Sequence, residues 1–251
     1  MESRLTLDIL PQPDDTTCGP TCLHAVYRYF SDDQQLSQVI DETQRLEEGG
    51  TLAVLLGCHA LKRGYECTLY TLDLQMMDPT WFLPDSEPLS DRLRLQAEFK
   101  TSPKLRLATK AYLEFVELGG NIYMEDFSPA LIRRYLKRSI PILTGISATY
   151  LYRAAREYGP RFEPDDVRGV PAGHFVVLTG YHPETREVLV ADPYLPNPLA
   201  PGHHYLVNID RVIASILLGI LTYDANMLII EPRDDHKAHK GKRRADPDRR
   251  E

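Results

Sequence analysis

Cys18 is the residue best placed for covalent chemistry, because it begins a predicted helix in the run TTCGPTC. Pro20 belongs in the first turn of a helix, where its missing N–H costs nothing. Unpaired backbone N–H groups and the positive end of the helix dipole at that position favour a thiolate. The thiolate is the nucleophilic form of cysteine, so Cys18 is a candidate nucleophile. A small residue at a helix terminus is the plainer explanation of the same position.

His174 is the candidate base among the eight histidines of the chain. It begins the most apolar strand-like run, HFVVLTGYH, and can therefore project from a sheet edge into a cleft. Asp192 ends the next run, EVLVAD, and the intervening PETR fits a hairpin turn. Because a hairpin brings the beginning of one strand beside the end of the next, Asp192 is placed to orient the imidazole. A capping histidine and an Asp–Pro strand terminator are the plainer alternatives.

Acyl chemistry also needs hydrogen-bond donors for the oxyanion that develops on the substrate. The backbone N–H of Cys18 is one such donor. Gln12 lies six residues upstream, in LPQPDD, and its side-chain amide is the candidate for the second donor. A polar loop residue between two prolines is the alternative interpretation of Gln12.

The order of these four residues resembles the papain-like cysteine peptidase superfamily, and within it the stand-alone relatives of the bacteriocin-leader-processing (double-glycine) peptidases. The runs that carry the resemblance are QPDDTTCGPTC, GHFVVLTGYH and VADPY. It implies that Gln12 lines the oxyanion hole, Cys18 attacks, His174 acts as general base and acid, and Asp192 orients His174. It also implies a papain-like fold and an amide-forming ligase as a candidate partner.

The implied activity is that of a cysteine hydrolase that cleaves a peptide or small amide substrate through a thioester acyl-enzyme, without a cofactor. An acyl or peptidyl transferase with an amine acceptor is an alternative, because both reactions share the thioester. A non-catalytic binding module on the same fold is another. The chain has no Walker-type G-x-x-x-x-G-K-[ST] motif, so cleavage after a double-glycine leader is not implied.

A zinc site is a third alternative, with Cys18, Cys22, Cys58 and His59 as ligands. Adjacent residues on a helix point apart, which argues against Cys58 and His59 as a pair. We expect Cys22 and Cys58 to be buried in helix packing and no metal to be bound. Asp14 and Asp15 precede the nucleophile and would suit a basic or amine-bearing substrate, although turn formation explains them equally well.

Hydrophobic periodicity and turn residues predict helices first and strands later, an α+β fold in which a helical lobe with the nucleophile helix packs on an antiparallel sheet. We assign the aromatic and basic stretch 148–158 to helix packing. The predicted helices cover 18–30, 36–48, 51–63, two segments of 90–118 broken near Pro103, 128–138 and 210–221. The predicted strands cover 65–74, 140–147, 174–182, 187–194, 203–209 and 227–231.

Composition sets the limits of the domain. The 251 residues are 43% hydrophobic and 26% charged, enough for one sizeable core, and a net charge of −7 argues against nucleic acid as a partner. We predict one domain over 1–232 with a helical insertion at about 74–127. The tail 233–251 has eight basic and five acidic residues and almost no apolar ones, so we expect it to be disordered.

Neither the N-terminus nor the interior predicts a membrane segment. The beginning of the chain lacks the long apolar stretch of a secretory signal. The most apolar run, 212–223, is shorter than the roughly 20 residues needed to span a bilayer. With no export signal, the four cysteines are expected to be free, and we predict a cytoplasmic protein.

Overall fold

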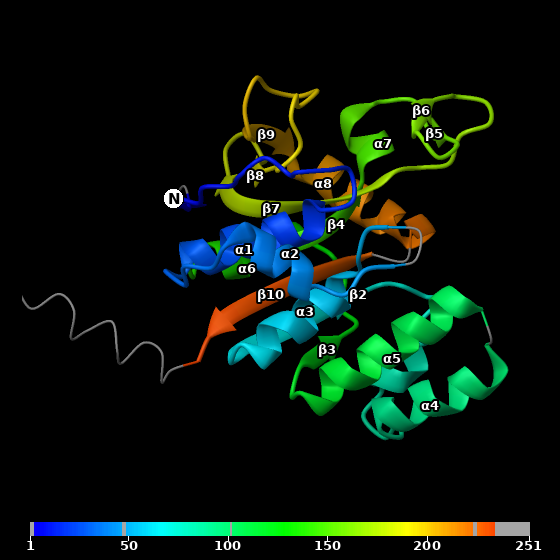
Figure 1. Cartoon of the computed structure of the whole chain (residues 1–251). Coiled ribbons are helices and arrows are strands. Elements are labelled where there is room, and N and C mark those ends of the chain that lie inside the picture. The colour runs from blue at the N-terminus through cyan, green and yellow to red at the C-terminus, as the bar shows by residue number, and fades with distance from the viewer. Residues whose placement is uncertain (1–2, 47–48, 101, 223–224, 234–251) are drawn as a thin grey trace, which may run out of the picture.

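An eight-stranded sheet runs through the centre of the computed structural model, which describes residues 3–46, 49–100, 102–222 and 225–233 (Figure 1). The strand order is β3-β2-β10-β4-β7-β8-β9, and β1 pairs with β7. The strands are β1 (Ser3–Arg4), β2 (Tyr65–Thr71), β3 (Asn121–Tyr123), β4 (Ile142–Ser147), β7 (Gly173–His182), β8 (Glu187–Ala191), β9 (His204–Asn208) and β10 (Asn226–Pro232).

The sheet is antiparallel, as predicted, except at one edge, where β3 runs parallel to β2. A parallel neighbour requires a crossover connection, and the helical segment between β2 and β3 supplies it. That segment contains a 3₁₀ turn and two helices: η1 (Pro79–Phe82), α4 (Leu89–Phe99) and α5 (Pro103–Glu117).

The remaining helices lie on both faces of the sheet (Figure 1). They are α1 (Cys18–Tyr29), α2 (Leu36–Glu42), α3 (Ala53–Lys62), α6 (Pro129–Leu136), α7 (Ala148–Tyr152) and α8 (Ile209–Leu217), which continues into the 3₁₀ turn η2 (Leu218–Thr222). A separate two-stranded ribbon pairs β5 (Glu157–Tyr158) with β6 (Glu163–Pro164). The predicted elements are present, but α2 ends at Glu42, earlier than expected, because the backbone turns to an extended conformation at Thr43.

Two hydrophobic clusters fill the two faces, and β7 contributes to both. Phe175 and Val177 belong to the cluster under α1 and α3, whereas Val176 and Leu178 belong to the cluster under α6 and α8. Successive side chains of a strand point to opposite faces, so a strand buried on both faces needs apolar residues throughout. This explains the uninterrupted apolar run after His174.

The segment predicted as a helical insertion shares the first of these clusters. Leu93 of α4 and Tyr112 and Phe115 of α5 are fully buried there, together with Leu56 of α3. The boundaries of the insertion stay a prediction. Of the predicted tail, Arg233 is exposed, and residues 234–251 lie outside the described residues.

Candidate active site

Helix α1 places Cys18 at its first residue, with the whole first turn buried. Gly19 makes this possible, because a Cβ at that position would lie 2.6 Å from Cγ2 of Thr51 in the loop before α3. Cys18 itself retains 8% exposure and lines a cavity of about 170 Å³. The nucleophile candidate therefore lies at a helix N-terminus that opens onto a small cavity.

Strands β7 and β8 bring His174 and Asp192 together. His174 is the second residue of β7, and Nε2 of its ring lies 2.8 Å from Oδ1 of Asp192. His174 is 8% exposed and Asp192 is completely buried. The carboxylate can only accept, so Nε2 carries the proton, and Nδ1 is the nitrogen left for Cys18.

The charges of His174 and Asp192 support one another. Burial alone would lower the pKa of His174, but the neighbouring Cys18 and the hydrogen-bonded Asp192 carboxylate raise that pKa to about 10. Burial alone would raise the pKa of Asp192, but its hydrogen bonds from His174, Tyr152 and Tyr205 lower it to about 2. Asp192 is thus held ionised beside an imidazole that favours its protonated form.

The other three cysteines are buried in the hydrophobic core and do not line the cavity beside Cys18. Burial raises the pKa of Cys22 well above its ordinary value and that of Cys58 to about 12, and it also raises the pKa of Cys67. Their thiols donate to backbone carbonyls: Cys22 to Phe175 at 3.2 Å and Cys58 to Ala111 at 3.5 Å. All four cysteines are free. Among the residues that the structure describes, no group of three or more His, Cys, Asp and Glu side chains could hold a metal ion.

Gln12 lies in the loop before α1, and its backbone N–H donates to the carbonyl of Pro193, next to Asp192, at 3.0 Å. Its side-chain Nε2 donates to the carbonyl of Asp14 at 2.9 Å, and its Oε1 is buried without a hydrogen-bond partner. The amide nitrogen carries two N–H groups, so one is left for an oxyanion. Unlike His174 and Asp192, the Gln12 amide is engaged by its own loop.

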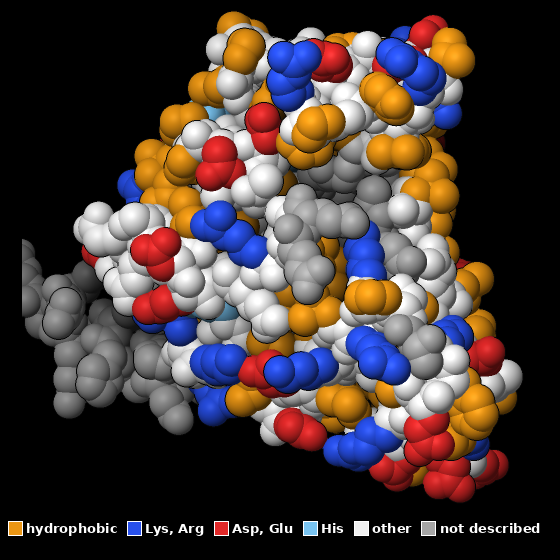
Figure 2. All heavy atoms as spheres, turned by 45° about the vertical axis from the view of Figure 1, so that its right-hand side comes forward, with side chains coloured by type: hydrophobic (Ala, Val, Ile, Leu, Met, Phe, Trp, Pro, Cys, Tyr) orange, Lys and Arg blue, Asp and Glu red, His pale blue; other side chains and the backbone are white. Residues whose placement is uncertain are grey.

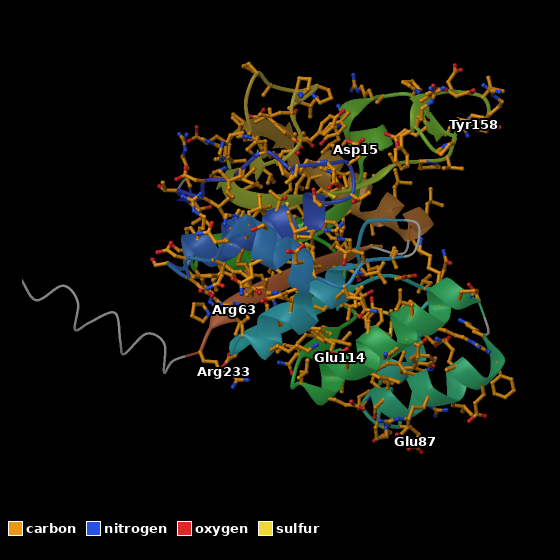
Figure 3. The ribbon with its side chains drawn as sticks, in the orientation of Figure 1. Asp15, Arg63, Glu87, Glu114, Tyr158 and Arg233 are labelled. Atoms are coloured by element: carbon orange, nitrogen blue, oxygen red, sulfur yellow. The ribbon has the colours of Figure 1, made fainter. Side chains whose placement is uncertain are left out.

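A second cavity of about 490 Å³ adjoins the first, and the two share Asp15, Gly49, Gly50, Gly173 and His174. We call the pair the Cys18 cleft. Asp15 lies between the beginning of α1 and α7 (Figure 3), while Asp14 accepts from the backbone and hydroxyl of Thr16. Asp14 therefore has the turn role that the sequence allowed, and Asp15 lines the cleft.

The segment 148–158 differs from the helix packing that we predicted. Only Ala148–Tyr152 is helical, and Arg153 adopts a left-handed backbone conformation that ends α7. Tyr152 and Glu157 line the Cys18 cleft as a result. Sequence reasoning also missed Tyr205, because only the fold brings β9 beside the end of β8. Tyr152 and Tyr205 lie 40 and 13 residues from Asp192 in the chain, so no local sequence pattern connects them to it.

The exterior is mixed in charge. On the face shown in Figure 2, basic and acidic side chains are interspersed, with no large patch of one sign. Across the described part of the chain, no helix is both long and apolar enough to cross a membrane.

Comparison with known proteins agrees with the resemblance in the motifs. The family model of the Peptidase_C39 like family matches residues 103–200, which include His174 and Asp192 but not Gln12 or Cys18. No curated protein matches the chain.

Three solved structures are similar to this chain. A C39-like peptidase from Bacillus anthracis is 12% identical, with a TM-score of 0.52 over 93% of this chain and 98% of its own. A double-glycine motif protease from an AMS/PCAT transporter, solved in complex with the leader peptide, is 13% identical, with a TM-score of 0.45 over 92% of this chain and 94% of its own. Xylellain, a cysteine protease from Xylella fastidiosa, is 13% identical, with a TM-score of 0.43 over 92% and 85%. The Bacillus anthracis structure, the one of these three with a TM-score above 0.5, and the arrangement of helices and strands show the papain-like α+β fold that the motifs predicted.

Proposed function

We propose that this chain is a cysteine hydrolase that cleaves a peptide or other amide bond through a thioester acyl-enzyme. The observation that carries the proposal is that the hydrogen-bonded pair of His174 and Asp192 adjoins Cys18, because Cys18 and His174 line the same partly open cleft. Such an arrangement supplies a thiolate, an acid for the leaving amine and a fixed imidazole orientation.

The reaction begins when the Cys18 thiolate attacks the carbonyl carbon of the scissile amide. The oxyanion that forms accepts hydrogen bonds from the backbone N–H of Cys18 and from the Gln12 amide. Nδ1 of His174 gives its proton to the leaving nitrogen, the C–N bond breaks, and an amine departs from a thioester on Cys18. His174 then takes a proton from water, which attacks the thioester; the carboxylic acid is released and the Cys18 thiolate and the protonated His174 are restored.

Three features bear on this proposal. Cys18 differs from the other cysteines in lining the cleft, as a nucleophile must and a packing residue need not. The lining of the cleft is mixed in charge, with Asp15 and Glu157 beside Lys104 and Arg161, so both basic and acidic groups of a substrate would find a partner there. The four free cysteines accord with a reducing compartment such as the cytoplasm.

The test is cleavage of a mixed peptide library, read by mass spectrometry of the new termini. Cleavage should occur with the parent protein and with Cys22→Ala, a matched control one helical turn away, and should be absent with Cys18→Ala. Products that persist in Cys18→Ala would refute the assignment of the nucleophile.

The same library distinguishes the alternative functions. In water labelled with ¹⁸O, hydrolysis places the label in the new carboxyl group, whereas added glycinamide would appear in the product of an acyl transferase. Peptides retained by both the parent and Cys18→Ala without cleavage would indicate a binding module. An amide-forming ligase stays a candidate partner, tested by co-purification with the tagged chain.

A further inference from the structure

The two carboxylate oxygens of Asp192 have different partners. Oδ1 accepts from Nε2 of His174 at 2.8 Å and from the backbone N–H of Tyr194 at 2.9 Å. Oδ2 accepts from the hydroxyls of Tyr152 and Tyr205, each at 2.6 Å. A buried carboxylate without such donors would be costly, because it has lost its water. Four donors therefore compensate the burial of one charge, and only one of them is the imidazole.

The two tyrosines come from separate parts of the fold. Tyr152 is the last residue of α7, whereas Tyr205 lies in β9. The backbone of Asp192 is also held on both sides by His203, whose carbonyl accepts from the Asp192 N–H at 2.8 Å and whose Nδ1 donates to the Asp192 carbonyl at 2.7 Å. Asp192 can turn away from His174 only if both tyrosine bonds break.

Tyr152 has a second contact that Tyr205 lacks. Its ring centroid lies 6.1 Å from that of His174 and 6.3 Å from that of Tyr194, on which it stacks. Tyr152 and Tyr194 both line the larger cavity, together with His174. Tyr205 is 6% exposed and does not line that cavity. Its hydroxyl contacts Asp192 and does not face the cavity.

From these contacts we propose that Tyr152 and Tyr205 are positioning residues, which hold Asp192 ionised and oriented so that Nδ1 of His174 faces Cys18. This inference rests on the proposed function. Removal of either hydroxyl takes away one of the two donors that fix Oδ2, so Asp192 is held less firmly in the orientation in which Oδ1 accepts from His174. The imidazolium is then less stabilised, and so is the Cys18 thiolate that faces it.

The test follows the reactivity of Cys18 rather than turnover, so it needs no substrate. Tyr152→Phe and Tyr205→Phe each remove one hydroxyl and keep the ring. Tyr135→Phe is the matched control, because its buried hydroxyl bonds to that of Tyr70 at 2.7 Å and neither residue lines the Cys18 cleft. The rate of alkylation of Cys18 by iodoacetamide is measured by mass spectrometry between about pH 4 and pH 8.

Each of the two site variants should move the acid limb of the rate profile upward by about 0.5–1 pH unit, and lower the rate below that limb by roughly 3–10-fold. Tyr135→Phe should follow the parent profile. A merely structural tyrosine would change the melting temperature and leave the profile in place. If one site variant does not fold, the other still decides the question.

Failure of this inference is distinct from failure of the proposed function. Profiles of Tyr152→Phe and Tyr205→Phe that coincide with the parent would overturn the positioning role, while a reactive Cys18 in the parent would keep the hydrolase proposal. A parent Cys18 no more reactive than the buried cysteines, with no cleavage of the peptide library, would overturn the hydrolase proposal and the positioning role that rests on it.

Discussion

Oδ1 of Asp192 and Nε2 of His174 lie 2.8 Å apart although 18 residues separate them in the chain. The register of β7 and β8 explains the approach. Ala191 pairs with Val177, so the next residue, Asp192, reaches the level of Val176, on the same side of the strand as His174. Diagonal neighbours on one side of an antiparallel pair are within reach of long side chains. The register of the hairpin therefore brings the carboxylate within reach of the imidazole.

This contact predicts a pH window for stability. The pKa of Asp192 is lowered from 3.8 to about 2, so its ionised form stabilises the folded protein. This stabilisation is fully present above pH 3.8 and is lost as the pH falls through 2. The pKa of His174 is raised from 6.5 to about 10, so its protonated form stabilises the folded protein. This stabilisation is fully present below pH 6.5 and is lost as the pH rises through 10. The stabilisation is therefore greatest between about pH 4 and pH 6.5.

His174→Gln should lower the free energy of unfolding by about 3 kcal/mol at pH 5.5, because it leaves the buried Asp192 charge without its cationic partner. The difference from the parent should shrink as the pH approaches 10. Urea unfolding at pH 5.5, 8 and 10 measures this difference. His204→Gln is the control, since its ring donates to the Leu7 carbonyl and has no carboxylate partner there. A pH-independent difference for His174→Gln would contradict the ion pair.

Iodoacetamide should alkylate Cys18 at least about 100-fold faster than Cys22, Cys58 or Cys67 at about pH 6. Cys18 lines the cleft, whereas the other three thiols are at most 3% exposed and burial raises their pKa values. Peptide mapping by mass spectrometry gives the four rates in one experiment. Similar rates for all four thiols in the folded protein would remove Cys18 from its assigned role.

The sequence predicts those parts of the site that local rules determine. The helix that begins at Cys18 follows from Pro20 and the apolar spacing after it, and the His174–Asp192 hairpin follows from two apolar runs around a short turn. The parallel strand β3 was not predicted. Three residues after a pair of glycines carry no strand signal, and only the crossover through α5 brings them beside β2.

The tyrosines around Asp192 show the same limit. Their role depends on where α7 ends and on the register of β9 with β8, in which Ala191 pairs with His204. Neither fact is encoded within a few residues of Asp192. Gln12 is an intermediate case: its position before α1 follows from the sequence, but its hydrogen bond to Asp14 is a detail of loop geometry.

Gln12→Ala should lower kcat on a peptide found by the library screen by roughly 10²–10³. The alkylation rate of Cys18 should be unchanged, because that reaction forms no oxyanion, and the melting temperature should change little. Gln38→Ala is the control, since its amide bonds to Glu42 on the surface of α2. Full activity of Gln12→Ala would show that Gln12 does not bind the oxyanion and serves only in the turn with Asp14.

The last prediction concerns the helical segment between β2 and β3. Phe115 is completely buried against α3, where a Cβ at Gly57 would lie 2.5 Å from its ring. Phe115→Ala should therefore lower the free energy of unfolding by about 3–5 kcal/mol. Phe99, which is 76% exposed at the end of α4, is the control, and Phe99→Ala should cost less than about 0.5 kcal/mol.

Because α5 shares its core with the sheet, urea unfolding should show one transition by far-ultraviolet circular dichroism and by tyrosine fluorescence. The contrary result would be two transitions in Phe115→Ala, with the reactivity of Cys18 unchanged after the first of them. It would show that 74–127 is an insertion that unfolds on its own.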